Sequence, residues 1–233
     1  MITKEQRSRY ARQIALDGWG EAGQKRLLDA KVLIIGAGGL ASPAALYLSA
    51  AGIGCIGIAD GDTVSISNLQ RQIIHSSSDM GRMKVSSAKE KMEAINPDCK
   101  VITYPRFLLG EDLEEIIEAY DFIIEATDSY ESRFRVSDIC VRKKKPYVMG
   151  GVEQYSGQIM TYIPGGISYR DVFPEIPTDV KKELPVLGPV VGIIGTAMAA
   201  EAIKYLTGTG ELLSGRLLLV NLQSMDFQCI NLE

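Results

Sequence analysis

Short apolar runs alternate with longer, more polar segments along the first two thirds of the chain. The runs predict strands at 32–35, 55–59, 100–104, 122–126 and 147–150. The segments between them predict helices at 41–52, 84–95, 111–119 and 129–143. Unbroken apolar strands that alternate with helices are typical of a parallel sheet covered by helices on both faces. The pattern therefore predicts an α/β fold with a doubly wound, mostly parallel sheet.

The two ends of the chain depart from this alternation. Residues 4–29 are mostly polar and are broken at Gly18-Trp19-Gly20, which predicts two helices outside the sheet. Strand-like runs follow in the C-terminal part, at 147–152, 157–163, 216–222 and 225–232. The first two alternate in polarity and are joined by a short turn, so the sheet is expected to continue in antiparallel pairing.

One long helix and one long connection are also predicted in the C-terminal third. Residues 188–206 are small and apolar and contain glycines, which predicts a buried helix that we expect at a subunit interface. Residues 164–186 are rich in proline, glycine and charge, and so long a connection in a compact domain is usually functional. We interpret it as a lid or crossover segment. A single domain is expected over 1–233, with N-terminal helices in 1–29 and antiparallel strands in 151–233.

A glycine-rich turn follows the first strand directly. Gly36, Gly38 and Gly39 lie between that strand and a helical segment, and the next strand ends at Asp60. Glycines let the backbone approach a phosphate, and the following helix N-terminus offers free N–H groups. An acidic residue after the second strand accepts hydrogen bonds from ribose hydroxyls. This unit predicts a nucleotide site in a Rossmann-like fold, with 30–150 as the nucleotide-binding core; a tight turn without a ligand is the alternative.

Polar side chains gather where the predicted strands end. They are Asp60, Asp62, Asn68, Arg71, Gln72, Lys84 and Asp128. The carboxyl ends of the strands form the ligand-binding edge of an open α/β sheet. Two cations and three carboxylates beside a glycine turn suit a triphosphate with Mg²⁺ better than a dinucleotide. The set therefore predicts ATP and Mg²⁺ as ligands.

Composition narrows the class of protein without defining its chemistry. Of the 233 residues, 46% are hydrophobic and 23% are charged, which suits a globular protein with a sizeable core. The net charge of −4 gives no reason to expect nucleic acid or an anionic membrane as a partner. No unbroken apolar run reaches the ~18 residues of a membrane span, and the start of the chain is too polar for a secretory signal. A cytoplasmic location is expected.

The cysteines and the single histidine exclude several kinds of site. The cysteines are scattered, without a CxxC pair, so neither a zinc knuckle nor a dithiol redox site is predicted. Apolar neighbours predict burial for Cys55 and Cys140, and we expect Cys140 and Cys229 to be structural. His75 alone cannot form a multi-histidine metal site, and it leaves little room for a Ser-His-Asp or Cys-His nucleophile.

Taken together and in their order, the motifs resemble the ThiF/MoeB/HesA family, the bacterial and archaeal relatives of ubiquitin-activating enzymes. The matching segments are RYARQI at 9–14, GAGGLA at 36–41, DGDTVSISNLQRQ at 60–72, GRMKV at 81–85, ATDS at 126–129 and LGPVVGIIG at 187–195. The resemblance implies ATP- and Mg²⁺-dependent adenylylation, in which a carboxylate attacks the α-phosphate and yields an acyl-adenylate and pyrophosphate.

The resemblance also implies roles for individual residues. Those implied to contact the nucleotide are Gly36, Gly38 and Gly39 at its phosphates, Asp60 at its ribose, and Asn68, Arg71 and Lys84 at its triphosphate, with Asp62 and Gln72 beside them. Arg71, Lys84 and Asp128 are the implied catalytic residues, and Asp128 is the implied Mg²⁺ ligand. Arg12 matches an arginine that reaches across a two-fold interface into the partner's active site, which implies a homodimer.

The chain departs from the family pattern in three places, of which the first concerns zinc, the second concerns sulfur transfer and the third lies at the edge of the site. Where a first zinc-binding CxxC pair is usual, this chain has Ser168-Tyr169-Arg170-Asp171, and no second pair follows, so zinc is not expected. Residues 175–186 contain no cysteine where sulfur-transferring members place one, so a thioester or persulfide step on this segment is not supported. Ser129 and Ala41 replace a common asparagine and a glycine at the edge of the site.

Two substrates stay open for the activation step. The first is a small-molecule carboxylate, as in the family's branch that activates guanylylpyridinol for the iron-guanylylpyridinol cofactor, and the missing cysteines favour it. The second is the C-terminal glycine of a ubiquitin-like sulfur carrier of thiamine or molybdopterin biosynthesis. Two hypotheses come from other classes. A NAD-binding oxidoreductase would leave Arg71, Lys84 and Asp128 without a role, and an inactive binding scaffold would not need them.

Overall fold

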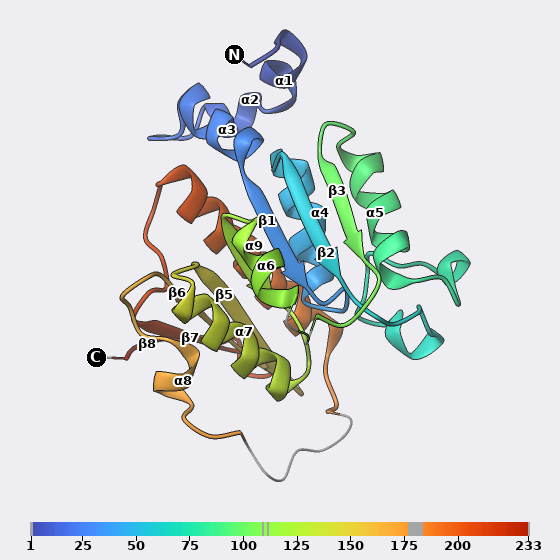
Figure 1. The fold of residues 1–233 in the computed structure, drawn as a ribbon, viewed down its shortest axis with the longest axis vertical. Helices are drawn as coiled ribbons and strands as arrows, with labels where there is room; N and C mark the ends of the chain where they lie inside the picture. The colour runs from blue at the N-terminus through green and yellow to red at the C-terminus, as the bar shows by residue number, and fades with distance from the viewer. Residues whose placement is uncertain (1, 109, 111, 177–183, 233) are drawn as a thin grey trace.

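Eight strands form one sheet in the order β3-β2-β1-β4-β5-β6-β7-β8 (Figure 1). The computed structural model describes residues 2–108, 110, 112–176 and 184–232. Within them the strands are β1 (Lys31–Ile35), β2 (Cys55–Ala59), β3 (Lys100–Tyr104), β4 (Phe122–Glu125), β5 (Tyr147–Glu153), β6 (Ser156–Tyr162), β7 (Arg216–Asn221) and β8 (Asp226–Asn231). Neighbouring strands from β3 to β5 pair in parallel, and those from β5 to β8 pair antiparallel. The predicted Rossmann-like sheet with an antiparallel C-terminal extension is confirmed.

Helices cover both faces of the sheet (Figure 1). On one face lie α3 (Gly20–Asp29), α4 (Ala41–Ala51), α5 (Lys84–Ile95) and α9 (Gly188–Thr207). On the other face lie α6 (Asp112–Glu118), α7 (Tyr130–Arg142) and α8 (Tyr169–Val172). The short helices α1 (Lys4–Arg9) and α2 (Ala11–Ile14) lie with α3 beyond the end at which β1 begins.

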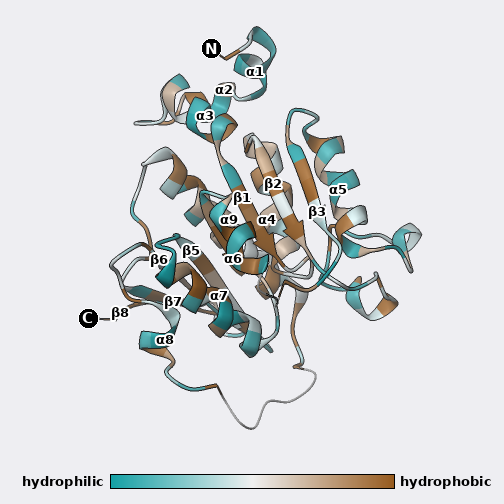
Figure 2. Ribbon diagram, viewed as in Figure 1, coloured by the Kyte–Doolittle hydropathy of each residue, from teal (hydrophilic) through white to brown (hydrophobic). Residues whose placement is uncertain are grey.

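The place of β1 between β2 and β4 explains why its four buried residues, 32–35, are all apolar. Val32 and Ile34 pack into the hydrophobic core on the α4 and α9 side, whereas Leu33 and Ile35 pack into the core on the α6 and α7 side. Successive side chains of a strand point to opposite faces, so a strand between two helical layers needs apolar residues at every position. Figure 2 shows this apolar composition along the strands and α4, and polar residues on the outer sides of α5 and α7.

Helix α9 is long and apolar enough to count as a candidate membrane span by length and composition, with a mean hydropathy of 1.3 over 18 residues. Half of that window is buried inside the protein. The helix packs on α4, β5 and β6, and at Gly195 a Cβ atom would come within 2.2 Å of the Leu40 carbonyl oxygen. The apolar composition of α9 therefore follows from its place in the core. The predicted buried helix is confirmed; its place at a subunit interface stays a prediction.

The N-terminal segment and the long connection differ in detail from their predictions. Three helices form in the N-terminal segment in place of two, because the chain bends at Tyr10, whose buried ring lies against Gly52 and whose hydroxyl accepts a hydrogen bond from Asn96. The connection 164–186 contains the short helix α8, which begins with a capping box formed by Ser168 and Asp171. This pair is a sequence pattern that indicates the start of a helix. Residues 177–183 of the expected lid lie outside the described residues.

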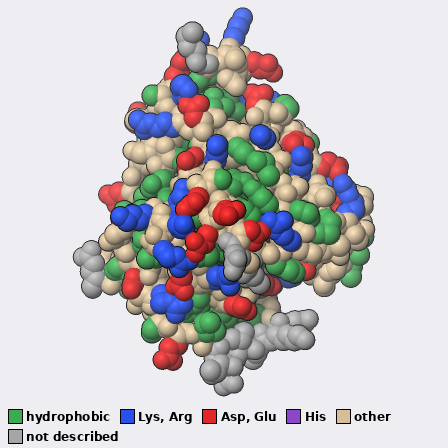
Figure 3. Space-filling model, in the orientation of Figure 1, with side chains coloured by type: hydrophobic (Ala, Val, Ile, Leu, Met, Phe, Trp, Pro, Cys, Tyr) green, Lys and Arg blue, Asp and Glu red, His purple; other side chains and the backbone are tan. Residues whose placement is uncertain are grey.

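Charged side chains of both signs are interspersed over the face that α6, α7 and α8 form (Figure 3). Ion pairs join α7 to its neighbours on this face: Arg142 with Glu114, Lys143 with Glu118, and Arg170 with Asp138. The basic run at the end of α7 therefore pairs with acidic neighbours, besides lying where a helix dipole favours cations.

Candidate nucleotide-binding site

A cavity of about 1230 Å³ opens at the carboxyl ends of the parallel strands. It is lined by all the predicted nucleotide-binding residues and the predicted metal ligand: Gly36, Gly38, Gly39, Asp60, Asp62, Asn68, Arg71, Gln72, Lys84 and Asp128. Residues that lie up to about 90 positions apart in the chain thus meet in one cavity, and their individual binding roles stay predictions. Arg12 does not line the cavity; it is exposed on α2, at the opposite end of the sheet (Figure 1).

The glycine turn at the edge of this cavity depends on the absence of side chains. Gly36 has φ 100°, and a Cβ there would come within 2.7 Å of the Ala126 carbonyl oxygen at the end of β4. A Cβ at Gly39 would lie 2.6 Å from a methyl carbon of Val191 on α9. Helix α4, which starts directly after the turn, has no side-chain hydrogen bond at its N-cap. Within α4 the Ser42 N–H already donates to the Gly38 carbonyl oxygen and Pro43 has no N–H. The N–H groups open to an anion are therefore those of the preceding cavity residues, Gly38, Gly39 and Leu40, which make no hydrogen bond to the described chain.

Asp60 ties the glycine turn to the end of β2. One carboxylate oxygen accepts the Ala37 N–H at 2.8 Å, and the other accepts the Asp62 N–H at 2.8 Å. Lys84, the first residue of α5, lies 3.9 Å from Asp60 and donates to the Asp62 carboxylate at 2.8 Å. Because Lys84 is almost fully buried, these two carboxylates offset the cost of burying its charge. The site thus holds an ammonium group in place before any ligand binds.

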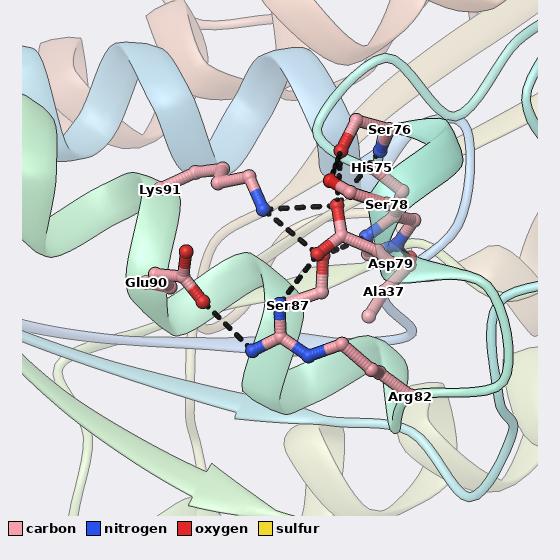
Figure 4. Close-up of polar contacts among 9 residues, drawn as sticks. All are labelled: Ala37, His75, Ser76, Ser78, Asp79, Arg82, Ser87, Glu90 and Lys91. Atoms are coloured by element: carbon pink, nitrogen blue, oxygen red, sulfur yellow. Dashed lines mark hydrogen bonds and ion pairs between the residues drawn. The ribbon is translucent and has the colours of Figure 1, made fainter.

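His75 holds the same turn from the other side (Figure 4). One ring nitrogen, Nε2, lies 2.9 Å from the Ala37 carbonyl oxygen, and Nδ1 lies 2.9 Å from the Ser87 hydroxyl on α5. A carbonyl oxygen only accepts, so Nε2 carries the proton and Nδ1 accepts from Ser87. Burial lowers the pKa of His75, which favours this neutral ring. With both nitrogens bonded inside the protein, His75 positions the turn and is not arranged as a general base.

Some polar side chains in the cavity still have atoms that can form hydrogen bonds or ion pairs with a ligand. The Gln72 Oε1 atom is buried without a hydrogen-bond partner among the described residues, and its amide lies against Gly38. Arg71 donates to the Ser67 carbonyl oxygen at 3.1 Å and forms no ion pair within the described chain. Asn68, in contrast, uses its side-chain oxygen to cap a short turn at Ser65. Gln72 and Arg71 are the groups whose bonding a nucleotide would complete.

Asp128 fits the predicted magnesium ligand in its chemistry. Its exposed carboxylate follows β4 at the cavity wall and makes no hydrogen bond or ion pair to any described residue. Carboxylate oxygen suits Mg²⁺, which commonly takes one or two protein carboxylates and completes its coordination with phosphates and water. Among the described residues no group of three or more His, Cys, Asp or Glu side chains could hold a metal alone. The protein would therefore supply part of the coordination.

The cavity continues along the antiparallel strands, a part that the sequence did not predict. Its lining there includes Gly151, Gln158, Asn221, Asp226 and Gln228. Amide side chains at the surface of strands are common, so no local pattern marked them. Two further charged residues were missed for another reason: Arg133, which lines the cavity, looks like an ordinary helix residue, and Glu125 at the end of β4 is fully buried behind the lining.

A second charged group, the Asp79 cluster (Ser76, Asp79, Arg82, Glu90 and Lys91), lies outside the cavity lining (Figure 4). The Asp79 carboxylate is fully buried and accepts hydrogen bonds from the N–H and hydroxyl of Ser76, from Arg82 at 2.7 Å and from Lys91 at 2.9 Å. Burial acts to raise the pKa of Asp79, but the hydrogen bonds from Lys91 and Ser76 outweigh it and hold the pKa well below its usual range.

The cysteines agree only in part with the prediction. Cys140 is fully buried and Cys55 is partly buried. Burial also raises the pKa of the Cys99 thiol to about 11, so this thiol is not a reactive one. Cys229 is exposed on β8, so it does not pack in the core, and its expected structural role stays a prediction.

The fold and the cavity define an α/β protein with a Rossmann-like phosphate turn and a charged ligand site. A family profile described as the ThiF family matches residues 10–233, and the chain belongs to that family. The resemblance drawn from the motifs is confirmed.

Related proteins carry the name adenylyltransferase, the class of enzyme that the motifs predict. A probable molybdopterin-synthase adenylyltransferase of Gracilaria tenuistipitata var. liui is 42% identical over 224 residues, which cover 94% of this chain and 63% of that protein. The probable adenylyltransferase/sulfurtransferase MoeZ of Mycobacterium tuberculosis (strain ATCC 25618 / H37Rv) is 40% identical over 241 residues, covering 100% of this chain and 62% of MoeZ. The chain thus spans less than two thirds of the length of these relatives.

Solved structures share the fold over nearly the whole chain. PaaA superposes with a TM-score of 0.85 at 27% identity, over 99% of this chain and 74% of that one. Escherichia coli MccB with ATP superposes with a TM-score of 0.79 at 21% identity, over 96% of this chain and 71% of that one. At this low identity the likeness to MccB shows the fold alone.

Proposed function

We propose that this chain uses ATP to adenylylate the C-terminal carboxylate of a small, ubiquitin-like sulfur-carrier protein of the molybdopterin-synthase type. Family membership and the names of the relatives support this substrate over the guanylylpyridinol carboxylate that the missing cysteines favoured. Those names give no support to an NAD-binding oxidoreductase or to an inactive scaffold. The cysteine missing from 175–186 concerns later sulfur transfer and the missing CxxC pairs concern zinc, and adenylylation uses neither.

The extent of the cavity is the observation that carries the proposal. Its volume of about 1230 Å³ exceeds the ~300–1,000 Å³ of ordinary small-molecule pockets, so space remains beside a nucleotide for a second substrate. That space runs along β5 to β8 and ends at Asp226 and Gln228 on the edge strand β8. An extended polypeptide end suits a space that crosses four strands, whereas a compact acid would need only the half beside the glycine turn.

Exposed apolar side chains beside this end of the cavity suit a protein partner. Met225, Phe227 and Ile230 are 69%, 51% and 43% exposed, and all six residues of β8 are exposed. An unpaired edge strand with apolar side chains is a typical site of contact with another protein. A carrier protein could rest on β8 while its C-terminus enters the cavity.

The proposed chemistry depends on positioned charge. One oxygen of the substrate carboxylate forms a bond to the α-phosphorus of ATP, and the bond from that phosphorus to the oxygen bridging to the β-phosphate breaks, with its electrons, to release pyrophosphate. The carboxylate is already a nucleophile, so no base is required. Arg71 and Lys84 neutralise charge on the phosphates in the transition state. Mg²⁺, held by Asp128 and phosphate oxygens, would supply further charge neutralisation.

We further propose a homodimer in which Arg12 completes the partner's site. Arg12 is exposed and lies at the opposite end of the sheet from its own cavity, so only a second copy could bring it there. Arg12→Ala and Asp128→Asn variants should each be inactive alone, and mixed dimers should regain activity at one site. A mixture without regained activity would contradict the shared site. The cytoplasmic location and the lack of zinc stay predictions.

The test of the proposed function is ATP–pyrophosphate exchange with defined carboxylates. We expect exchange to be stimulated by a purified sulfur-carrier subunit of molybdopterin synthase and to stay at background with the same protein lacking its C-terminal glycine. The same exchange is measured with guanylylpyridinol as the carboxylate, and the binding of NAD is compared with that of ATP. Stimulation by guanylylpyridinol but not by the carrier would overturn the proposed substrate. Binding of NAD in preference to ATP would overturn the proposed reaction.

A further inference from the structure

A buried charge pair at the end of β4 has no part in the reaction described above. Glu125, the last residue of β4, is fully buried, and Arg133 on α7 is 9% exposed and lines the cavity. Arg133 Nε lies 3.7 Å from Glu125 Oε2, and both atoms are buried without a hydrogen-bond partner among the described residues. Burial raises the pKa of Glu125 to about 7, and the charge of Arg133 opposes this rise.

These two side chains enclose a single residue, Thr127. Glu125 Oε1 accepts the Thr127 N–H at 3.1 Å and also accepts the Thr127 hydroxyl. Arg133 Nη2 donates to the Thr127 carbonyl oxygen at 3.2 Å. The N–H, the hydroxyl and the carbonyl of Thr127 are thus all bonded to the pair. The next residue, Asp128, makes no hydrogen bond to the described chain, so its place at the cavity wall is set by its two neighbours: Thr127, which the pair holds, and Ser129, which caps α7.

We propose that Glu125 and Arg133 are positioning residues that hold Asp128 in place for the metal, an inference that rests on the proposed role of Asp128. Stability alone is a weak reason for such a pair. Desolvating two charges is costly, and their attraction offsets this cost only with good geometry and satisfied hydrogen bonds. Here two polar atoms stay without partners. Partners of a metal ligand, in contrast, commonly tune metal affinity by fixing where the ligand lies.

The chain contains a matched control for this pair. Glu201 on α9 is 2% exposed and accepts a threonine hydroxyl, that of Thr161, at 2.6 Å and the Leu213 N–H at 2.8 Å. Lys204 forms an ion pair with it. Glu201 thus repeats the buried glutamate, the threonine, the backbone N–H and the cation, but its partners lie outside the cavity lining, whereas Thr127 and Arg133 are part of that lining. A glutamine at either position tests the loss of one buried charge.

The experiment measures ATP affinity by calorimetry with and without Mg²⁺, which gives the gain in affinity due to the metal. We expect Glu125→Gln to lower that gain by about 10-fold with little change in metal-free ATP affinity. Glu201→Gln should leave the gain as in the wild type, even if it lowers the melting temperature as much as Glu125→Gln does. Arg133→Lys keeps a cation but loses the planar guanidinium, so we expect it to lower the gain in ATP affinity to the same extent. This variant replaces Glu125→Gln in the test if Glu125→Gln does not fold.

Two outcomes separate this inference from the function on which it rests. If Asp128→Asn removes the gain while folded Glu125→Gln and Arg133→Lys keep it, the positioning role is overturned and the proposed function stands. If Asp128→Asn itself keeps the wild-type gain, the metal role of Asp128 is overturned, and the positioning inference falls with it. An equal loss of the gain in Glu201→Gln would also overturn the inference, because a general loss of stability would then explain the effect.

Discussion

The Asp79 cluster and the nucleotide cavity use the same residue types to opposite effect. In the cluster, Asp79 is buried and bonded to Ser76, Arg82 and Lys91, so its charge is satisfied inside the protein (Figure 4). In the cavity, Asp128 is exposed and makes no bond to the described chain. A charge whose partners lie within the chain stabilises the fold, and a charge without them is free to bind a ligand.

Lys84 lies between these two extremes. It is buried and paired with Asp62 and Asp60, like a structural lysine, yet it lines the cavity. Asp62 is half exposed, so its bond to Lys84 is open to exchange for a phosphate oxygen. The comparison thus separates charged groups that stabilise the fold, in the Asp79 cluster, from charged groups that can bind a ligand, in the cavity. Substitutions in both regions test this distinction.

The largest effect is expected for Asp128→Asn. The change removes a negative charge that the proposed metal needs, so we expect substrate-dependent ATP–pyrophosphate exchange to fall by about 100-fold or more. Asp128 is exposed and unbonded, so the free energy of unfolding should change by less than about 0.5 kcal/mol. Arg71→Ala should lower exchange in the same way. Wild-type exchange in either folded variant would remove its residue from the site.

Asp79→Asn should show the reverse pattern. An amide there loses charged hydrogen bonds to Lys91 and Arg82, so we expect a loss of about 2–3 kcal/mol in the free energy of unfolding, measured in urea. The KM for ATP should stay within about threefold of the wild-type value, because Asp79 lies outside the cavity lining. A large rise in KM without a loss of stability would break the division between the two regions.

The pH dependence of stability sharpens the same prediction. The pKa of Asp79 is lower in the folded protein than in the unfolded chain, so its stabilising contribution is fully present above the unfolded value of about 4. That contribution is lost as the pH falls through this value toward the folded pKa. The gap in unfolding free energy between wild type and Asp79→Asn should therefore narrow below about pH 4, and a constant gap would contradict the ion pairing.

The smallest effect is expected at His75, which links the two regions. Glutamine can place its side-chain nitrogen where Nε2 donates to Ala37, whereas asparagine reaches only the position of Nδ1 beside Ser87. We expect His75→Asn to raise the KM for ATP by about fivefold, the value of one hydrogen bond, and His75→Gln to stay nearer the wild type. Equal KM values for both variants, in folded proteins, would show that the bond to Ala37 does not position the turn.

The sequence predicted the glycine turn and its acid because their chemistry is local. Gly36 needs a left-handed backbone and a close approach to β4, and only one residue type meets both needs. The sequence selected Asp128 by its place after a strand, but it gave no sign of the structural role of Asp79, because pairing with Arg82 and Lys91 is a property of the folded chain. The far half of the cavity escaped prediction for the same reason: strands β5 to β8 bring its amides together only in the sheet.

The central claim is that the charged side chains of the cavity bind a nucleotide's triphosphate, and a crystal structure with ATP and Mg²⁺ tests it most directly. The account predicts Arg71 and Lys84 within hydrogen-bonding distance of phosphate oxygens, Asp128 at the metal, and the Asp79 cluster unchanged. A nucleotide bound elsewhere, or one bound here with these three side chains turned away from its phosphates, would contradict the account.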